Sequence, residues 1–317
     1  SIIMSSVAFG GEHYVNNWED YKQAIVEDIM KLDREIIIHY KKDGLLENYT
    51  EEDIFNSRDE IRKKVKDLYK EAREPKHWTP EDKNVWGTEI SSFHGRFPNE
   101  EKYVLRSATY VMTYYASAEE FEFAQEVIDN FIANNITEDM SDYEKVKAIY
   151  EFVIENYKYG FVTTGDEEQN QRDERNIWLG LQGKPVVCEA YAILFAKMIT
   201  ELGYNNMIIS GKAGNPPEGH AWNLVEINGQ WYHVDPTWGD DEEDGVDYKY
   251  LLTSDEFIEN KESSVNSRTW DRSKYPEAPE VYNEEEHIER ELGKQVEKLG
   301  EQIQGLGGQV QELRDEV

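Results

Sequence analysis

The sequence predicts an α+β protein in three parts: a small α+β domain over 1–115, a second α+β domain over 116–283, and a C-terminal coiled-coil helix over 284–317. Three observations predict this arrangement. Amphipathic stretches alternate with short β-branched runs, a two-residue turn signal joins two strands in the middle part, and a seven-residue repeat fills the end of the chain. A length of 317 residues also favours more than one domain.

The composition excludes several classes of protein. Asp and Glu number 66 against 34 Lys and Arg, and a net charge of −32 makes nucleic acid and anionic membranes poor partners. No stretch reaches the roughly 18 apolar residues of a transmembrane helix. The chain begins at Ser1 without a signal peptide, as in a mature or shortened protein. The single cysteine, Cys188, excludes an intrachain disulfide and a zinc site of paired cysteines.

The first part mixes helix and strand without a chemical motif. Trp18–Asp33 and Thr50–Arg73 carry apolar residues at helical spacing, whereas Glu35–Tyr40 and Tyr103–Tyr115 are typical of strands. Its histidines lack metal-ligand spacing, and we interpret them as structural or surface residues: His13, His39, His77 and His94.

The middle part opens with two signals for the start of a helix. Ser117-Ala-Glu-Glu120 and Ser141-Asp-Tyr-Glu144 both fit the capping box, in which a hydroxyl and a carboxylate satisfy the first backbone amides. The polar stretch Gly165–Arg175 that follows is predicted to be a mobile loop.

Cys188 stands at the start of a predicted apolar helix. Pro185 and the two valines after it resist helix, every residue from Cys188 to Leu202 tolerates it, and Gly203 is a stop signal. Free amides and the positive end of the helix dipole favour a thiolate there and could bind an oxyanion. By itself this position leaves both a structural and a nucleophilic cysteine open.

A predicted hairpin supplies the partners of a nucleophile. Asn228-Gly229 favours a two-residue type I′ turn, so that Asp235 lies opposite Trp222 and diagonal to His220 on the same face. Diagonal neighbours are about 7–8 Å apart, within reach of a His–Asp hydrogen bond. Cys188, His220 and Asp235 are therefore candidates for a nucleophile, a base and the residue that orients the base. His233 shares this face, and we interpret it as a supporting or structural residue.

Three blocks of sequence carry a family resemblance: Cys188-Glu-Ala-Tyr-Ala, Gly219-His-Ala-Trp-Asn and Trp231-Tyr-His-Val-Asp-Pro-Thr-Trp. Together they resemble the transglutaminase-like (papain-like cysteine) superfamily, in its bacterial branch, over roughly 142–279. The resemblance implies a papain-like transglutaminase core, in which a helix bearing Cys188 packs on an antiparallel sheet bearing His220 and Asp235. The chain departs from the family in having Ala190, and Pro185-Val186 before the cysteine, where glycines are usual.

Three further residues near the cysteine and the hairpin are candidates for the site. Gln182 stands six residues before Cys188, a spacing similar to that of the glutamine that supports the oxyanion in papain-like proteases. It is a candidate for that role, with a plain loop residue as the alternative. Trp222 and Tyr191 are candidates for the substrate cleft, and we expect Trp222 to shield the His–Asp pair from water.

These residues predict acyl transfer through a thioester. His220 would deprotonate Cys188, and the thiolate would attack a glutamine side chain of a protein substrate. A lysine amine would then give a crosslink, or water would give deamidation. The alternatives are a cysteine protease or amidase with the same triad, and a non-catalytic surface adhesion module. We expect no cofactor. Asp240–Asp247 resembles a calcium loop in part, but its twelfth position is Leu251, not Glu, and a solvated acidic loop fits better.

The last part carries a heptad repeat. Valine or isoleucine at 296, 303, 310 and 317 alternates with leucine at 299, 306 and 313, which favours a two-stranded parallel coiled coil. Gly293, Gly300 and Gly307 weaken that helix by about 1 kcal/mol each, so a disordered tail is the alternative. The repeat reaches Val317, and we expect the natural protein to continue. The stalk, the lone thiol and the acidity predict a secreted or cell-surface bacterial protein that forms homo-oligomers through this helix.

Overall fold

The computed structural model describes residues 12–15, 18–31, 35–40, 88–96, 103–112, 115–241, 245–259 and 267–315. The helix predicted over Thr50–Arg73, His77 and the side chain of His94 lie outside this description. Within it, no helix has both the length and the apolar character that crossing a bilayer requires.

A mixed sheet with helix α1 (Trp18–Met30) beside it forms the first part. The strands, in the order β1-β2-β4-β3, are β1 (Glu12–Val15), β2 (Glu35–Tyr40), β4 (Tyr103–Met112) and β3 (Thr88–Arg96). β1 runs parallel to β2, and the other pairs are antiparallel. Ile25 and Ile38 are buried, and His13 pairs with Asp28 at 2.7 Å, a structural role for this histidine.

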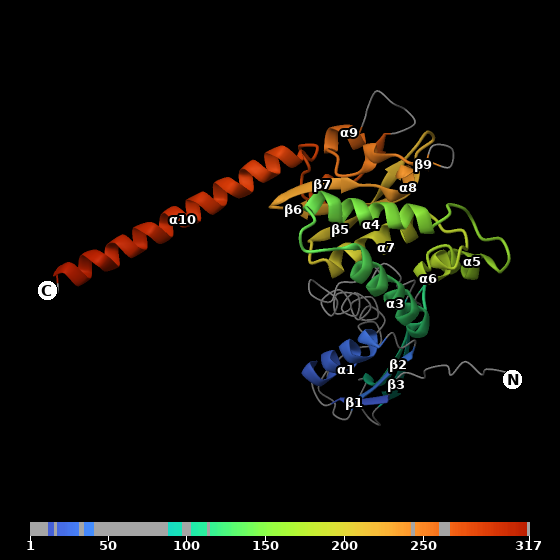
Figure 1. The fold of residues 1–317 in the computed structure, drawn as a ribbon. Coiled ribbons are helices and arrows are strands. Elements are labelled where there is room, and N and C mark those ends of the chain that lie inside the picture. The colour runs from blue at the N-terminus through green and yellow to red at the C-terminus, as the bar shows by residue number, and fades with distance from the viewer. Residues whose placement is uncertain are drawn as a thin grey trace.

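The second part is built around helix α7 (Cys188–Glu201), which packs on β5 and β6 and is covered by α4 (Figure 1). Every residue from Ala190 to Ile199 is buried, because this helix is apolar on nearly its whole circumference. The sheet order is β10-β5-β6-β7, with antiparallel pairing throughout. Its strands are β5 (Asn206–Ala213), β6 (Glu218–Ile227), β7 (Gln230–Val234) and β10 (Arg268–Thr269). The predicted arrangement, a cysteine-bearing helix on an antiparallel sheet, is confirmed.

The helices before α7 are α3 (Ala118–Asn135), α4 (Asp142–Asn156), α5 (Glu167–Asp173) and α6 (Ile177–Leu181). Both predicted capping boxes are present, at Ser117 and Ser141. The loop predicted over 165–175 is wrong, since α5 occupies most of it. Asp166 caps this helix, and pairs one turn apart such as Glu168 and Arg172 support it. None of its residues is buried, so the sequence of this helix has no apolar periodicity from which it could be predicted.

Short elements follow β7. They are α8 (Pro236–Gly239), β8 (Asp240–Asp241), β9 (Gly245–Val246), α9 (Asp255–Glu259) and 3₁₀ turns at Tyr248–Tyr250 and Arg272–Lys274. The ends of the acidic run pair with each other as β8 and β9, and residues 242–244 between them lie outside the description.

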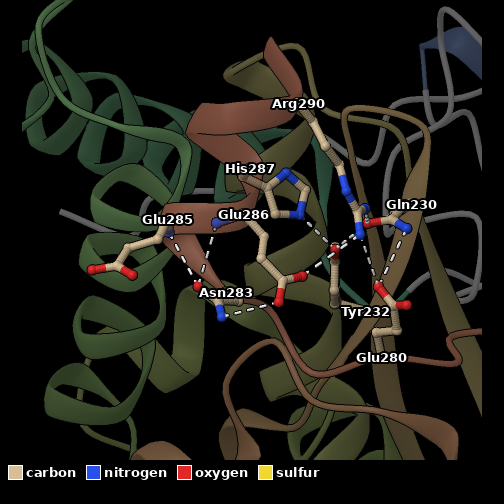
Figure 2. Close-up of polar contacts among 8 residues, drawn as sticks. All are labelled: Gln230, Tyr232, Glu280, Asn283, Glu285, Glu286, His287 and Arg290. Atoms are coloured by element: carbon tan, nitrogen blue, oxygen red, sulfur yellow. Dashed lines mark hydrogen bonds and ion pairs between the residues drawn. The ribbon is translucent and has the colours of Figure 1, made fainter. Parts of the chain in front are cut away.

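The chain ends in α10 (Glu284–Asp315), a single helix that extends away from the sheet (Figure 1). Its base is joined to β7 by side-chain contacts (Figure 2). His287 is buried and its Nε2 lies 2.6 Å from the Tyr232 hydroxyl, while Arg290 donates to Gln230 and, at 3.2 Å, to Glu280. The predicted C-terminal helix is confirmed; its pairing with another helix stays a prediction.

Candidate active site

Cys188 is the first residue of α7 and is half-buried. The chain just before it is fixed by backbone pairing, because Val186 donates to Lys158 O and accepts from Gly160 N, both at 3.0 Å. Val187, at the N-cap position, provides no side-chain hydrogen bond, in contrast to the serine caps of α3 and α4. The first-turn amides of α7 are therefore not covered by a capping side chain beside the sulfur.

His220 reaches the cysteine from β6. The hairpin has the predicted register, with Ile227 opposite Gln230, and both turn residues, Asn228 and Gly229, have positive φ. Nε2 of His220 lies 2.8 Å from Asp235 Oδ2. The Cys188 side chain is close enough to the ring to contribute to the raised pKa of His220. The imidazole is thus bonded to a carboxylate and lies near the cysteine.

Asp235 directly follows β7 and is fully buried. Its two oxygens have different partners. Oδ1 accepts from the backbone amide of Trp238 at 3.2 Å, as the cap of α8. Oδ2 accepts from His220 and from Nε and Nη2 of Arg268, at 2.8 and 2.6 Å. Arg268, on β10, is the site residue that sequence reasoning missed.

The charges of this cluster shift the pKa values of two of its members. Burial alone would lower the pKa of His220, but the charge of Asp235 and hydrogen bonds with Asp235 and Cys188 raise it to about 9. Burial alone would raise the pKa of Asp235, but the positive charges of His220 and Arg268 bring it to about 2. At neutral pH the site therefore holds an imidazolium, a carboxylate and a guanidinium in contact.

Aromatic rings enclose the histidine. Trp222 is fully buried and stacks on the His220 ring at 5.6 Å, so it covers that ring and does not line an open cleft as predicted. Trp238 meets the same ring edge-on at 6.2 Å. The indole of Trp222 is itself fixed, since its N–H donates to His233 Nδ1 at 2.9 Å and His233 Nε2 lies 2.8 Å from Asp255. Burial lowers the pKa of His233, and a neutral ring suits this acceptor role. His233 therefore supports Trp222, as the sequence suggests.

Residues 130–236, which include the cysteine, the histidine and the aspartate described above, match the family model of the transglutaminase-like superfamily. This segment is a transglutaminase-like domain.

Curated relatives that the chain resembles include Kyphoscoliosis peptidase from Homo sapiens and from Mus musculus. The human protein is 26% identical over 144 residues, which are 42% of this chain and 21% of the relative. The mouse protein is 26% identical over 140 residues, or 41% of this chain and 21% of the relative. The chain thus spans about a fifth of the length of these relatives.

Two solved structures with similar chains are a TGase and a candidate cysteine protease from Cytophaga hutchinsonii. The TGase is 14% identical, with a TM-score of 0.35 over 83% of this chain and 72% of that one. The second is also 14% identical, with a TM-score of 0.30 over 60% of this chain and 72% of that one.

Two predicted site residues lie apart from the contacts between His220, Asp235 and Arg268. Tyr191 is fully buried and its hydroxyl donates to Asp240 at 2.5 Å, so its ring packs in the core instead of facing a cleft. The reason is its place on α7, three residues after Cys188 on the buried side. Gln182 is exposed at the end of α6, and its role as an oxyanion donor stays a prediction.

Metal ligands do not gather in the described part of the domain. No group of three or more His, Cys, Asp or Glu side chains there is placed to hold an ion. The calcium interpretation of the acidic run gains no support from its ends, because Asp240 accepts from Tyr191 and pairs in β8.

Proposed function

We propose that the domain is a cysteine-dependent acyltransferase of the transglutaminase type, with Cys188 as nucleophile, His220 as acid and base, and Asp235 as the residue that orients His220. The observation that carries the proposal is that one imidazole interacts with both other groups: His220 Nε2 lies 2.8 Å from Asp235 Oδ2, and the Cys188 side chain contributes to the raised pKa of the same ring. Nucleophilic catalysis by cysteine needs these three groups in this order.

The reaction follows from what each group can do. The sulfur of Cys188 attacks the carboxamide carbon of a glutamine side chain, and the resulting oxyanion is stabilised by the backbone amide of Cys188 at the start of α7. The C–N bond then breaks, His220 gives its proton to the departing ammonia, and a thioester remains. An amine or a water molecule opens the thioester after losing a proton to His220, which releases the product and restores the thiolate–imidazolium pair.

The charge state of the site supports this mechanism. His220, with a pKa of about 9, carries its proton at neutral pH and can donate it to the leaving group. The ring cannot turn away from the sulfur without losing its bond to Asp235, and Trp222 covers one of its faces.

A second candidate is a peptidase with the same triad, and the name of the curated relatives favours it. The chemistry up to the thioester is the same, but the bond that breaks is a backbone amide and the acceptor is water. The third candidate from the sequence, a non-catalytic adhesion module, requires no reactive thiol.

One experiment separates these candidates. The protein is incubated with a fluorescent amine and a glutamine-rich protein, beside Cys188→Ala and His220→Gln. His287→Gln, a matched histidine variant at the base of α10, is the control. Incorporation that both site variants abolish supports the transferase. Fragments without incorporation support the peptidase, and wild type indistinguishable from Cys188→Ala in both assays would leave the adhesion module.

We also propose that α10 pairs with α10 of a second copy. The apolar side chains described between 288 and 306 are open to solvent, with Val296 67% and Ile303 68% exposed. Positions flanking this stripe are uncharged, glycine at 293, 300 and 307 and glutamine at 295, 302 and 309, so two acidic chains can approach there. Light scattering is expected to give a dimer for wild type and a monomer for Ile303→Asp; a wild-type monomer at high concentration contradicts the pairing.

A further inference from the structure

Arg268 occupies an unusual place for a charged residue. Its side chain has no exposed surface, although isolated buried charges are strongly unfavourable. Both of the nitrogens that contact Asp235 donate to the same oxygen, Oδ2, which is also the oxygen bonded to His220. The guanidinium and the imidazolium therefore share one carboxylate oxygen.

Two aromatic rings also lie close to the guanidinium, in addition to the carboxylate that its edge contacts. Its central carbon lies 4.7 Å from the ring centre of Trp238 and 5.1 Å from that of Tyr250. A planar cation can lie against aromatic rings while two nitrogens of its edge donate to one oxygen, and the ammonium of lysine cannot do both. Arg268 thus fixes the position of Oδ2 by direct bonding.

The same contact alters the charge balance around His220. A carboxylate that pairs with an imidazole alone favours protonation of the imidazole. A second cation on the same carboxylate oxygen makes that protonation less favourable, because like charges within about 4–6 Å repel each other. Arg268 lies outside the segment that matches the family model, so this contribution comes from a later part of the chain.

We propose that Arg268 is a positioning residue for the cysteine–histidine pair: it holds Asp235 Oδ2 in place and limits how tightly Asp235 retains the proton of His220. The inference rests on the proposed role of the triad, but it concerns the reactivity of the Cys188–His220 pair and not the substrate. It predicts that removing the charge of Arg268 changes the pH range in which Cys188 reacts.

The test is the rate of alkylation of Cys188 by iodoacetamide, a neutral reagent, between pH 4 and pH 11. Cys188 is the only cysteine, so the label reports this site alone. Arg268→Met removes the positive charge, whereas Arg268→Lys keeps the charge but lacks the planar pair of N–H donors. Arg290→Met, the same substitution at the base of α10, is the control. His220→Gln shows which part of the profile depends on the imidazole.

Removing a cation from the site makes both the thiolate and the loss of the proton from His220 less favourable. Arg268→Met is therefore expected to move the whole profile to higher pH by about one unit. Arg268→Lys is expected to leave the profile in place and lower the rate at least about tenfold through loss of positioning, and Arg290→Met is expected to match wild type.

A wild-type profile in Arg268→Met, or equal shifts in both Arg268 variants, overturns the inference. If Arg268→Met does not fold, an unchanged rate in Arg268→Lys overturns the positioning role by itself. The outcome is independent of the acyltransferase proposal. Expected shifts in a protein without transferase activity would support the role of Arg268 and reject the proposed reaction. A wild-type profile that His220→Gln does not alter would reject both.

Discussion

Asp235→Asn tests the charge cluster most directly. The substitution keeps the size of a fully buried side chain and removes the negative charge that His220 and Arg268 share. Arg268 then remains buried without a carboxylate on the oxygen it contacts. Removing one partner of a buried ion pair costs about 3–5 kcal/mol. Because domains have a free energy of unfolding of about 5–15 kcal/mol, we expect a folded but much less stable variant.

The pKa values of His220 and Asp235 determine the pH range in which Asp235→Asn lowers stability most. The raised pKa of His220 means that its contribution to stability is complete below about pH 6.5 and is lost as the pH rises through about 9. The lowered pKa of Asp235 means that its contribution is present above about pH 4 and is lost as the pH falls through about 2. The stability difference between wild type and Asp235→Asn is therefore largest between about pH 4 and 6.5 and narrows on both sides.

Urea unfolding followed by tryptophan fluorescence across pH 3–10 measures this difference. Asp129→Asn, at an exposed site on α3, is the matched control and is expected to lie within about 0.5 kcal/mol of wild type. A difference between wild type and Asp235→Asn below about 1 kcal/mol, or one that stays constant across the pH range, would refute the account of Asp235 as the shared counter-ion.

Three further substitutions test the surroundings of the site. Gly211→Ala would bring a methyl group within 2.4 Å of the Thr269 carbonyl oxygen. We therefore expect a loss of about 1–3 kcal/mol in the free energy of unfolding, measured with urea, and slower alkylation of Cys188. Wild-type behaviour would contradict the close packing of β10. Trp222→Phe leaves His233 Nδ1 without its donor, which is expected to cost at least about 1–3 kcal/mol in the same assay, whereas a neutral result would argue against that hydrogen bond. Ser141→Ala removes one half of the capping box of α4 and is expected to lower the free energy of unfolding by about 1 kcal/mol without changing the alkylation rate of Cys188. An altered alkylation rate would mean that α4 is coupled to the site.

Much of the site could be predicted from the sequence because its elements are local. The Asn228-Gly229 turn fixes the hairpin register, and the register alone brings His220 and Asp235 within reach. The start of α7 at Cys188 follows from the helix-resisting residues before it. Gly203, with a φ of +86°, ends the helix as expected.

Arg268 could not be predicted in the same way. It lies 33 residues after its partner Asp235, on a strand of two residues whose pairing with β5 is not local. No periodicity marks so short a strand, and a charged residue is normally taken as exposed. The one sequence signal is chemical: a buried carboxylate that pairs with a histidine can also accept hydrogen bonds from a second cation, here Arg268. The helix over 167–173 was missed for a related reason, since side-chain pairs and a cap stabilise it and no apolar face does.

The joint between α10 and the sheet has a mechanical consequence. His287 and Arg290 bind to Tyr232 and Gln230, both on β7, and β7 ends one residue before Asp235. Tension or bending applied along α10 would act on the strand that leads directly to Asp235. A tether bound to the far end of this helix would therefore pull on the strand next to the candidate active site.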